Sequence, residues 1–387
     1  MLTCQKHLFD LADDVTYLNM AYMSPLMKQS MEIGVQGLKM KSRPYEIQVD
    51  DFFTPVEKVK ASFSRLVEGD DPHKIAIIPS ISYAMANAAR NIPLIKGEEI
   101  IVLEGQFPSH VYPWKALADD KGGKIITIKA PDSENSRGSD WTLRILESIG
   151  SETKIVAIPH VHWSDGTLYD LRNIREKLDQ YGGYLIIDGT QSIGAFPFSI
   201  KEIRPDVLAV SSYKWLLGPY GIGLSYYSER FSNGSPIENS WLNRLNSDDF
   251  ARLVDYQDEY RSGAYRYSVG ESSNFLAIPM MDSGIQQILK WGVDSIQEYG
   301  HHILGKDLEE LNAHGFKTAP PGERGNHLFG IGIPDHIPPK KLAAFLMEKN
   351  IYISVRGSYI RVSPYVYNTA EDISRLKDAL IEASGIL

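Results

Sequence analysis

The sequence predicts an α/β fold built around a mostly parallel β-sheet. Between about residues 55 and 227, short apolar runs rich in β-branched residues alternate with longer helix-like segments. The runs lack polar alternation, which is typical of strands buried on both faces of a parallel sheet. Polar side chains follow several of these runs, at the sheet edge where ligands bind in such folds.

Seven strands are expected in this region, at 75–78, 100–103, 125–128, 155–158, 185–187, 207–210 and 222–227. Helices are expected between them. The segment 55–67 begins with Pro55, which suits a first helical turn. The segment 170–183 begins with Asp170, a good N-cap residue, and ends in two glycines.

The remainder of the chain predicts a second, smaller unit. Residues 228–274 are polar and show little periodicity, and a helix-like region follows at about 275–313. We therefore expect a large α/β domain at 55–274, a small α+β domain at 275–387 and an N-terminal segment, 1–54, that packs with the small domain. A β/α/β/β/α pattern supports the small domain, at 327–333, 339–349, 351–355, 359–363 and 370–383.

Composition narrows the class of partner. The 387 residues carry a formal net charge of −9, from 40 basic and 49 acidic residues, which argues against nucleic acid or an anionic membrane as the main partner. The single cysteine, Cys4, excludes an intramolecular disulfide and a cysteine-built zinc site. Acidic residues stand where a signal peptide would be apolar, and no apolar run approaches the roughly 18 residues of a membrane span. We expect a cytoplasmic protein.

The residues that follow the expected strands combine a lysine, an acid, an aromatic ring and hydroxyl groups. These segments are 79–82, 104–108, 159–163, 188–191 and 211–214. A lysine in a pocket of low polarity loses its proton readily and can form a Schiff base with a carbonyl group. A helix N-terminus with serine hydroxyls binds phosphate, and an acid can hold a proton on a pyridine nitrogen. The set predicts pyridoxal 5′-phosphate (PLP) as the cofactor.

Two runs carry a resemblance to a known family: 188-DGTQSIG-194 and 206-DVLAVSSYKWLLGPYGIG-223, in which Lys214 follows Asp188 by 26 residues. Together with 104–114, 160–171 and 355–376, they resemble the class V aminotransferase family of fold-type I PLP-dependent enzymes, over roughly residues 55 to 385. The nearest branch resembles isopenicillin N epimerase and the cysteine desulfurases. The resemblance implies a large domain with a mostly parallel seven-stranded sheet flanked by helices, and a smaller α+β C-terminal domain.

The resemblance also assigns roles around the cofactor ring. Lys214 would form the Schiff base and move protons at the substrate α-carbon, and Asp188 would pair with the ring nitrogen. Gln191 would contact the phenolic oxygen of the ring. Phe107 would stack on the ring, and Trp163 stands where many relatives have an asparagine near the ring oxygen.

Further roles concern the phosphate and the substrate. The resemblance implies that Ser82, Ser211 and Tyr213 hold the phosphate, with Ile81 offering its backbone N–H. Arg361 matches the arginine that binds the substrate carboxylate, and Arg356 is a second candidate. Because family active sites lie at a dimer interface, we expect a homodimer in which residues near 270–274, such as Ser272, reach the partner's phosphate.

The expected activity is a PLP-dependent reaction at the α-carbon of an amino acid, of the aminotransferase type. An epimerase or a C–S or β-lyase of the same fold stays an alternative, because one PLP site supports all of these reactions. Sulfur transfer through an enzyme-bound persulfide is not expected, since the link 357–360 is short and Cys4 is remote in the sequence.

The same residues allow other interpretations. His160 and His162 could hold a metal for hydrolysis, with Asp165, Asp188 or His110, but this leaves Lys214 without a role. A family member that has lost catalysis is disfavoured by the retained Lys214 and Asp188. Taken singly, the residues also have ordinary explanations: Ser82 as a helix N-cap, Phe107 as a core residue and Arg361 as an ion-pair partner.

Overall fold

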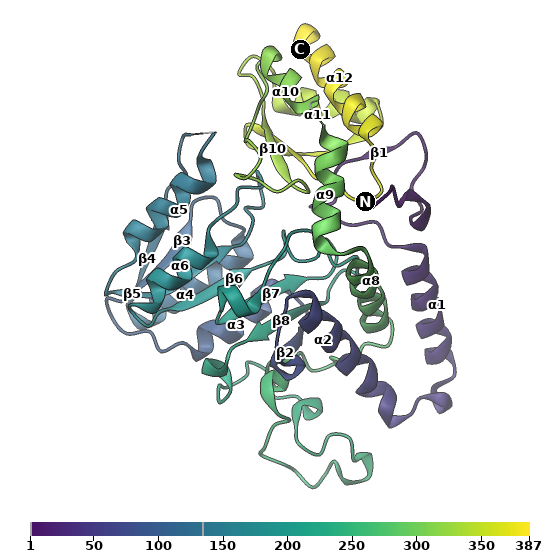
Figure 1. Ribbon diagram of the computed structural model, residues 1–387. Helices are drawn as coiled ribbons and strands as arrows, with labels where there is room; N and C mark the ends of the chain where they lie inside the picture. Colours follow the sequence, from purple (N-terminus) through teal and green to yellow (C-terminus); the bar gives the residue numbers. More distant parts are fainter. Residues whose placement is uncertain (1, 134, 306) are drawn as a thin grey trace.

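The computed structural model describes residues 2–133, 135–305 and 307–387 (Figure 1). Met1, Glu134 and Lys306 fall inside the three predicted domain ranges and lie outside the described residues. A seven-stranded sheet has the order β2-β8-β7-β6-β5-β3-β4. Its strands are β2 (Ile75–Ile78), β3 (Glu99–Leu103), β4 (Lys124–Ile128), β5 (Thr153–Pro159), β6 (Tyr184–Asp188), β7 (Val207–Ser211) and β8 (Gly223–Tyr227).

The sheet is mostly parallel, as the sequence predicts. β3 pairs in parallel with β4 and β5, and the β5–β6 and β6–β7 pairs are parallel as well. β8 alone runs against its neighbours, because it pairs antiparallel with both β2 and β7. The start of β8 therefore lies at the same edge as the ends of the other six strands.

Helices cover both faces of the sheet (Figure 1). Side chains that alternate along a strand enter different cores: Ile75 and Ile77 join one cluster, and Ala76 and Ile78 join the other. The first cluster includes residues of α2 (Thr54–Leu66), α5 (Arg137–Ser148), α6 (Leu171–Asp179), α7 (Ile200–Ile203) and α8 (Ala277–Trp291). The second includes residues of α3 (Ile81–Asn91) and α4 (Tyr112–Lys121).

A third core belongs to the C-terminal region. It lies between an antiparallel sheet of order β12-β13-β10-β9 and the helices packed on it. The strands are β9 (Lys317–Thr318), β10 (Phe329–Gly332), β12 (Ser354–Arg356) and β13 (Tyr359–Val362). The helices are α9 (Val293–Leu304), α10 (Asp307–Glu310), α11 (Pro339–Glu348) and α12 (Ala370–Ile386).

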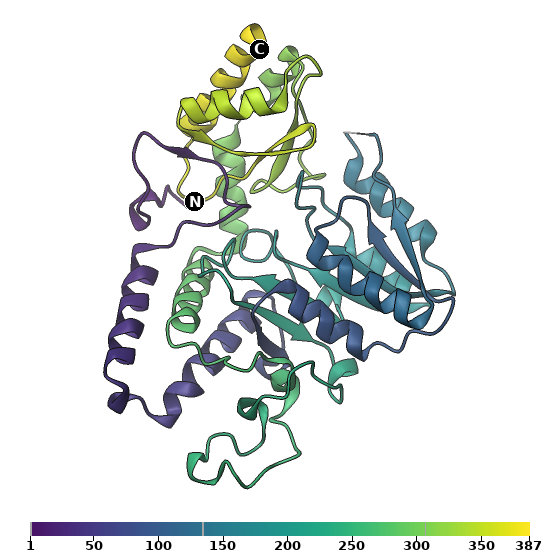
Figure 2. The same ribbon diagram turned by 180° about the vertical axis from the view of Figure 1, so that it is seen from behind.

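The N-terminal segment contacts both regions (Figure 2). β1 (Thr16–Tyr17) pairs in parallel with β11 (Ile351–Tyr352), next to the C-terminal sheet. α1 (Lys28–Ser42) then packs against α8. The domain boundaries predicted from the sequence stay a proposal.

The polar segment 228–274 contains only short 3₁₀ helices among its regular elements. These are η6 (Glu229–Phe231), η7 (Trp241–Asn243), η8 (Phe250–Arg252) and η9 (Gly263–Tyr267). Across the described residues, no helix combines the length and the apolar character that crossing a membrane would require.

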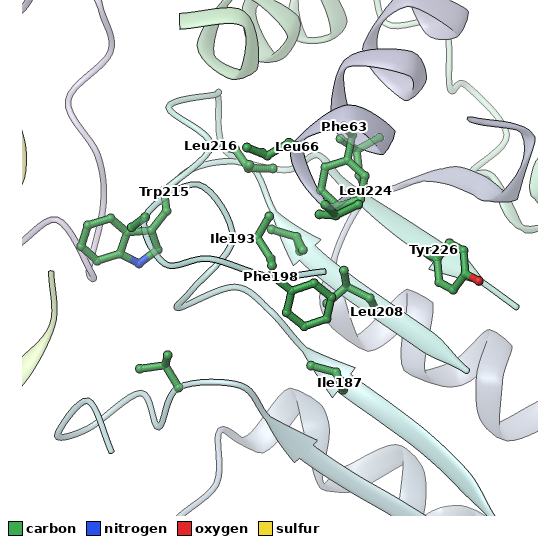
Figure 3. Packing of buried hydrophobic residues seen from close by; sticks show 14 of the residues in the cluster. Phe63, Leu66, Ile187, Ile193, Phe198, Leu208, Trp215, Leu216, Leu224 and Tyr226 are labelled. Carbon is green, nitrogen blue, oxygen red and sulfur yellow. The ribbon is translucent and has the colours of Figure 1, made fainter. Parts of the chain in front are cut away.

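The turn after β7 is anchored in the core. Trp215, Leu216 and Leu217 follow Lys214 and have no exposed surface. Figure 3 shows Leu216 beside Leu66, with Trp215 pointing to the other side of the turn. Leu217 has φ +57°, a left-handed conformation that costs of order 1–3 kcal/mol for a residue with a Cβ. Burial of three large apolar side chains offsets this strain and fixes the turn.

A close backbone contact brings the C-terminal sheet to the loop after β5. Gly166 has φ +79°, and a Cβ placed there would lie 2.1 Å from the carbonyl oxygen of Leu328. The N–H of Gly330 donates to the carbonyl of Asp165 in the same place, at 2.8 Å. Glycine is therefore required at residue 166 for both its dihedral angle and its space.

We predict that Gly166→Ala lowers the free energy of unfolding by roughly 2–5 kcal/mol, because the methyl group must displace the Leu328 backbone. Gly182→Ala is the matched control: Gly182 has φ +66° but nothing within 4 Å of its Cβ position. The control should lose only about 1–2 kcal/mol, from backbone strain. Thermal and denaturant unfolding measure both variants, and equal losses would contradict the steric argument.

Candidate active site

A cavity of about 260 Å³ opens at the carboxyl edge of the large sheet. Residues that follow β2, β3, β5, β6 and β7 line it, together with residues that precede β8. The cavity brings together eight residues that the sequence assigns to the cofactor: Ile81, Phe107, Trp163, Asp188, Gln191, Ser211, Tyr213 and Lys214.

The Lys214 side chain is 8% exposed, and it has no hydrogen bond or ion pair to any described residue. Its Nζ lies 5.8 Å from the centre of the Phe107 ring and 5.4 Å from that of Tyr213. Burial, together with the charge of Arg361, lowers the pKa of Lys214 from 10.5 to about 8, while the charge of Asp188 opposes the shift. Near neutral pH, a useful fraction of this amine is therefore unprotonated and nucleophilic.

Asp188 ends β6 and is also buried, at 8% exposed. Its Oδ1 accepts the N–H of Thr190 at 2.9 Å, and within the described chain no basic side chain forms an ion pair with it. Burial raises the pKa of Asp188, while the hydrogen bonds from Thr190 and the charge of Lys214 oppose this. The carboxylate is thus available to a protonated group inside the cavity.

The start of α3 forms one end of the cavity. Here the structure corrects a detail: the N-cap is Ser80, whose Oγ accepts the N–H of Tyr83 at 3.2 Å, and Ser82 already lies within the helix. The reason is that Ser80 has extended backbone dihedral angles and helical geometry begins at Ile81. The two serine hydroxyls lie 2.9 Å apart, and Ser80 rather than Ser82 lines the cavity. A helix N-terminus with paired hydroxyls is suited to a phosphate group.

Gln191 lines the cavity, but both ends of its amide have protein partners. Nε2 donates to the carbonyl of Ala21 at 3.1 Å, and Oε1 accepts from the indole N–H of Trp215 at 3.0 Å. Any contact with a ring oxygen would compete with these bonds. In this structure Gln191 ties the N-terminal segment to the turn that carries Lys214.

Trp163 forms part of the cavity wall. Its ring lies 5.6 Å from the Phe107 ring in an edge-to-face arrangement, and its indole N–H donates to the carbonyl of Gly105 at 2.7 Å. The guanidinium of Arg361 donates to the Trp163 carbonyl at 2.9 Å, and that of Arg356 lies 5.3 Å from the Trp163 ring. The two arginines therefore stand beside Trp163 and are not part of the cavity lining itself.

Ser272 is buried and does not line the cavity of its own chain. The segment that holds it is fixed near α3, because Glu238 accepts both the hydroxyl of Tyr83 at 3.0 Å and the N–H of Gly270 at 3.1 Å. Its role toward a partner's phosphate stays a prediction.

Several lining residues received no role from the sequence. Tyr220 is 73% exposed and lies 4.6 Å from the Tyr213 ring, at the cavity mouth. It precedes β8, and only the antiparallel direction of this strand brings it to the edge. Thr190 accepts the N–H of Ser211 at 3.2 Å and thereby joins the ends of β6 and β7. The position of Thr190, two residues after Asp188, could have predicted from the sequence that it lies at the cavity.

The two histidines of the hydrolase alternative have different surroundings. His160 packs edge-on between Phe196 and Phe198, and burial lowers its pKa to about 3. His162 lies 2.8 Å from the Ser164 hydroxyl and 3.4 Å from the Asp165 carboxylate. In the part of the chain that the structure describes, no three His, Cys, Asp or Glu side chains group as metal ligands would. The hydrolase alternative therefore gains no support.

Fold and site together define a PLP-dependent enzyme of fold type I. The family model described as aminotransferase class-V matches residues 47–376, and the chain belongs to this family. An uncharacterized aminotransferase, YcbU, of Bacillus subtilis is 25% identical over 328 residues, covering 84% of this chain and 82% of the relative.

Two further similarities agree with the predicted branch. Isopenicillin N epimerase of Streptomyces clavuligerus is 23% identical, covering 96% of this chain and 95% of its own length. The apo structure of a cysteine desulfurase from Thermococcus onnurineus covers 100% of both chains, with a TM-score of 0.80 at 19% identity. At that identity the structural likeness concerns the fold.

The cofactor of the enzyme is PLP, and the cavity fits it. Three observations carry the fit: the partnerless amine of Lys214, the buried carboxylate of Asp188 without a counter-ion, and the hydroxyl-bearing start of α3. Each offers a group for a different part of the cofactor, the aldehyde, the ring nitrogen and the phosphate.

We predict that the rate of PLP uptake by the apoenzyme rises with pH through a midpoint near 8, because only the neutral amine of Lys214 attacks an aldehyde and its pKa is lowered from 10.5 to about 8. Arg361→Gln removes a nearby cation, so it should shift the midpoint to higher pH. Stopped-flow absorbance of the lysine-bound cofactor measures both.

Arg172→Gln is the matched control, since it removes an equal charge at an exposed site paired with Glu202. The control should follow the wild-type curve. A wild-type midpoint near the ordinary value of lysine, or the same midpoint in Arg361→Gln, would contradict the account.

Proposed function

We propose that the enzyme acts on the α-carbon of an amino acid in an aminotransferase-type reaction, with Lys214 as the catalytic base. The observation that supports this most directly is that one cavity contains both the buried amine of Lys214, whose pKa is lowered, and the buried carboxylate of Asp188, which lacks a counter-ion. Bound PLP supplies an aldehyde that takes up an amino group and a ring that accepts electrons from a bond broken at the α-carbon.

The protein's own residues then have separable tasks. Lys214 would hold the cofactor at its aldehyde carbon at rest and would accept and return the α-proton of the substrate. Asp188 would keep a proton on the ring nitrogen. Ser80, Ser82 and the first N–H groups of α3 would hold the phosphate, with Ser211 and Tyr213 alongside.

Arg361 would bind the substrate carboxylate. It is 1% exposed, and its Nε has no partner among the described residues. Its NH1 donates a hydrogen bond to the carbonyl of Trp163, a residue of the cavity wall, and this bond fixes the position of the guanidinium. Phe107 would cover the ring face, 5.8 Å from Nζ of Lys214.

Epimerisation is the second candidate. The similarity to isopenicillin N epimerase extends over 96% of the chain, further than the similarity to YcbU. A panel of amino acids separates the candidates: transamination consumes a keto acid acceptor, epimerisation changes optical rotation alone, and a lyase releases ammonia.

A homodimer is part of the proposal. The exposed side chains of Met31, Val35 and Leu38 recur at helical spacing on α1, which gives this helix an apolar outer face. A second copy of the chain would cover it, and Ser272 would then approach the partner's phosphate. A cytoplasmic location stays a prediction from the sequence.

We predict that Lys214→Ala loses at least about 10³-fold in turnover and also loses the visible absorption of the lysine-bound cofactor. Added methylamine should restore part of the rate, because it replaces the missing base. Measurement of product formation with and without the amine tests this, and activity that survives the substitution would overturn the role of Lys214.

We predict that Asp188→Asn keeps its cofactor but loses roughly 100-fold in turnover, because a neutral amide does not hold the proton on the ring nitrogen. Equilibrium dialysis measures retention of the cofactor, and steady-state kinetics measures the loss. Wild-type activity in this variant would remove Asp188 from the chemistry.

A further inference from the structure

The strands β12 and β13 place two arginines on one face. Arg361 pairs with Ser354 across the ladder, and Arg356 follows Ser354 by two residues. Residues two apart on a strand point to the same side, so Arg356 and Arg361 are diagonal neighbours, with their Cβ atoms roughly 7–8 Å apart. Trp163 contacts both, through its carbonyl and through its ring.

Neither guanidinium is paired with a carboxylate of the described residues. Arg361 donates to the Trp163 carbonyl and to the Ser354 hydroxyl, and Arg356 donates only to the Val355 carbonyl. The Nε atoms of both are buried without a hydrogen-bond partner. Two neighbouring cations that lack counter-ions repel each other, and this arrangement costs free energy unless an anion binds to both.

Asp165, whose backbone contacts the strand next to β13, already has other partners. Asp165 lies in the loop that contacts β10, but its carboxylate pairs with Arg137 at 3.2 Å and with His162 at 3.4 Å, and it also accepts the hydroxyl of Thr167. Asp188 lines the cavity, where the charge of Lys214 acts on it. Beside Trp163, Arg356 and Arg361 thus carry one positive charge more than the single carboxylate of a neutral amino acid would neutralise.

We propose that the preferred substrate is an amino acid with a second carboxylate, whose distal carboxylate is bound by Arg356 while Arg361 binds the α-carboxylate. This inference rests on the proposed function and names its substrate class. Burial lowers the pKa of Arg361, and the charge of Arg356 lowers it further, so a ligand with two carboxylates would neutralise both guanidinium groups.

The test compares ligands of equal size and different charge. Wild-type holoenzyme should use glutamate over glutamine, and aspartate over asparagine, by roughly 10- to 100-fold in kcat/KM. Arg356→Gln should abolish this preference by raising KM for the acidic substrates while changing the amides little. Arg361→Gln should weaken the binding of all four substrates. Arg172→Gln, which removes an equal surface charge, should behave as the wild type.

Calorimetric binding of glutarate and butyrate to the holoenzyme tests the two arginines apart from turnover, because neither ligand has an amino group to react. Glutarate should bind more tightly than butyrate to the wild type, and the two should bind alike to Arg356→Gln. The binding result is independent of turnover. If the enzyme turned over none of the amino acids, the proposed function would be overturned, but the preference for glutarate would still support the binding roles of the two arginines.

The inference is overturned by equal use of glutamate and glutamine in the wild type together with equal binding of glutarate and butyrate. It is equally overturned by an Arg356→Gln variant that loses affinity for acidic and amide substrates to the same extent, since Arg356 would then serve the α-carboxylate. A change of oligomeric state with unchanged selectivity would assign Arg356 to a subunit contact and would overturn it too.

Discussion

Burial of the Lys214 amine without a partner is the constraint on which the site depends. The ammonium form is disfavoured there, and the pKa falls to about 8 because water is excluded. Such a position is stable only if the backbone around it is fixed by other means. The three fully buried residues Trp215 to Leu217 fix the backbone. Their packing also keeps Leu217 in a left-handed conformation, which an unpacked loop would not retain. Anchoring by the core thus keeps a reactive amine inside the cavity.

Topology explains why the groups around this amine come from distant parts of the chain. Parallel strands end at one edge, so Asp188, Ser211 and the start of α3 meet although they are far apart in sequence. The reversed strand β8 adds Tyr220 from its beginning instead of its end. The C-terminal sheet adds the arginines, and it approaches the loop after β5 because Gly166 leaves room for the Leu328 backbone.

The sequence predicted the parts that follow from local patterns. Unbroken apolar runs marked the seven strands, and the residues after them marked eight positions of the cavity wall, because both depend on neighbours in the chain. The rest depends on contacts that a local pattern does not contain. Tyr220 could be placed at the cavity only once the direction of β8 was known, and Ser80 could be identified as the N-cap only from its backbone angles. The bonds of Gln191 to Ala21 and Trp215 depend on how the N-terminal segment folds back onto the large sheet. The pairing of Arg356 with Arg361 needed the strand register.

We propose that Lys214 is the residue that binds the cofactor covalently. Borohydride reduction of the purified holoenzyme fixes the cofactor to its lysine, and peptide mapping by mass spectrometry then locates the pyridoxyl group. We predict that the modification lies on Lys214 alone, in the peptide that contains Trp215. Modification of a different lysine, such as the buried Lys60 on α2, or no modification of a protein that is yellow before reduction, would contradict it.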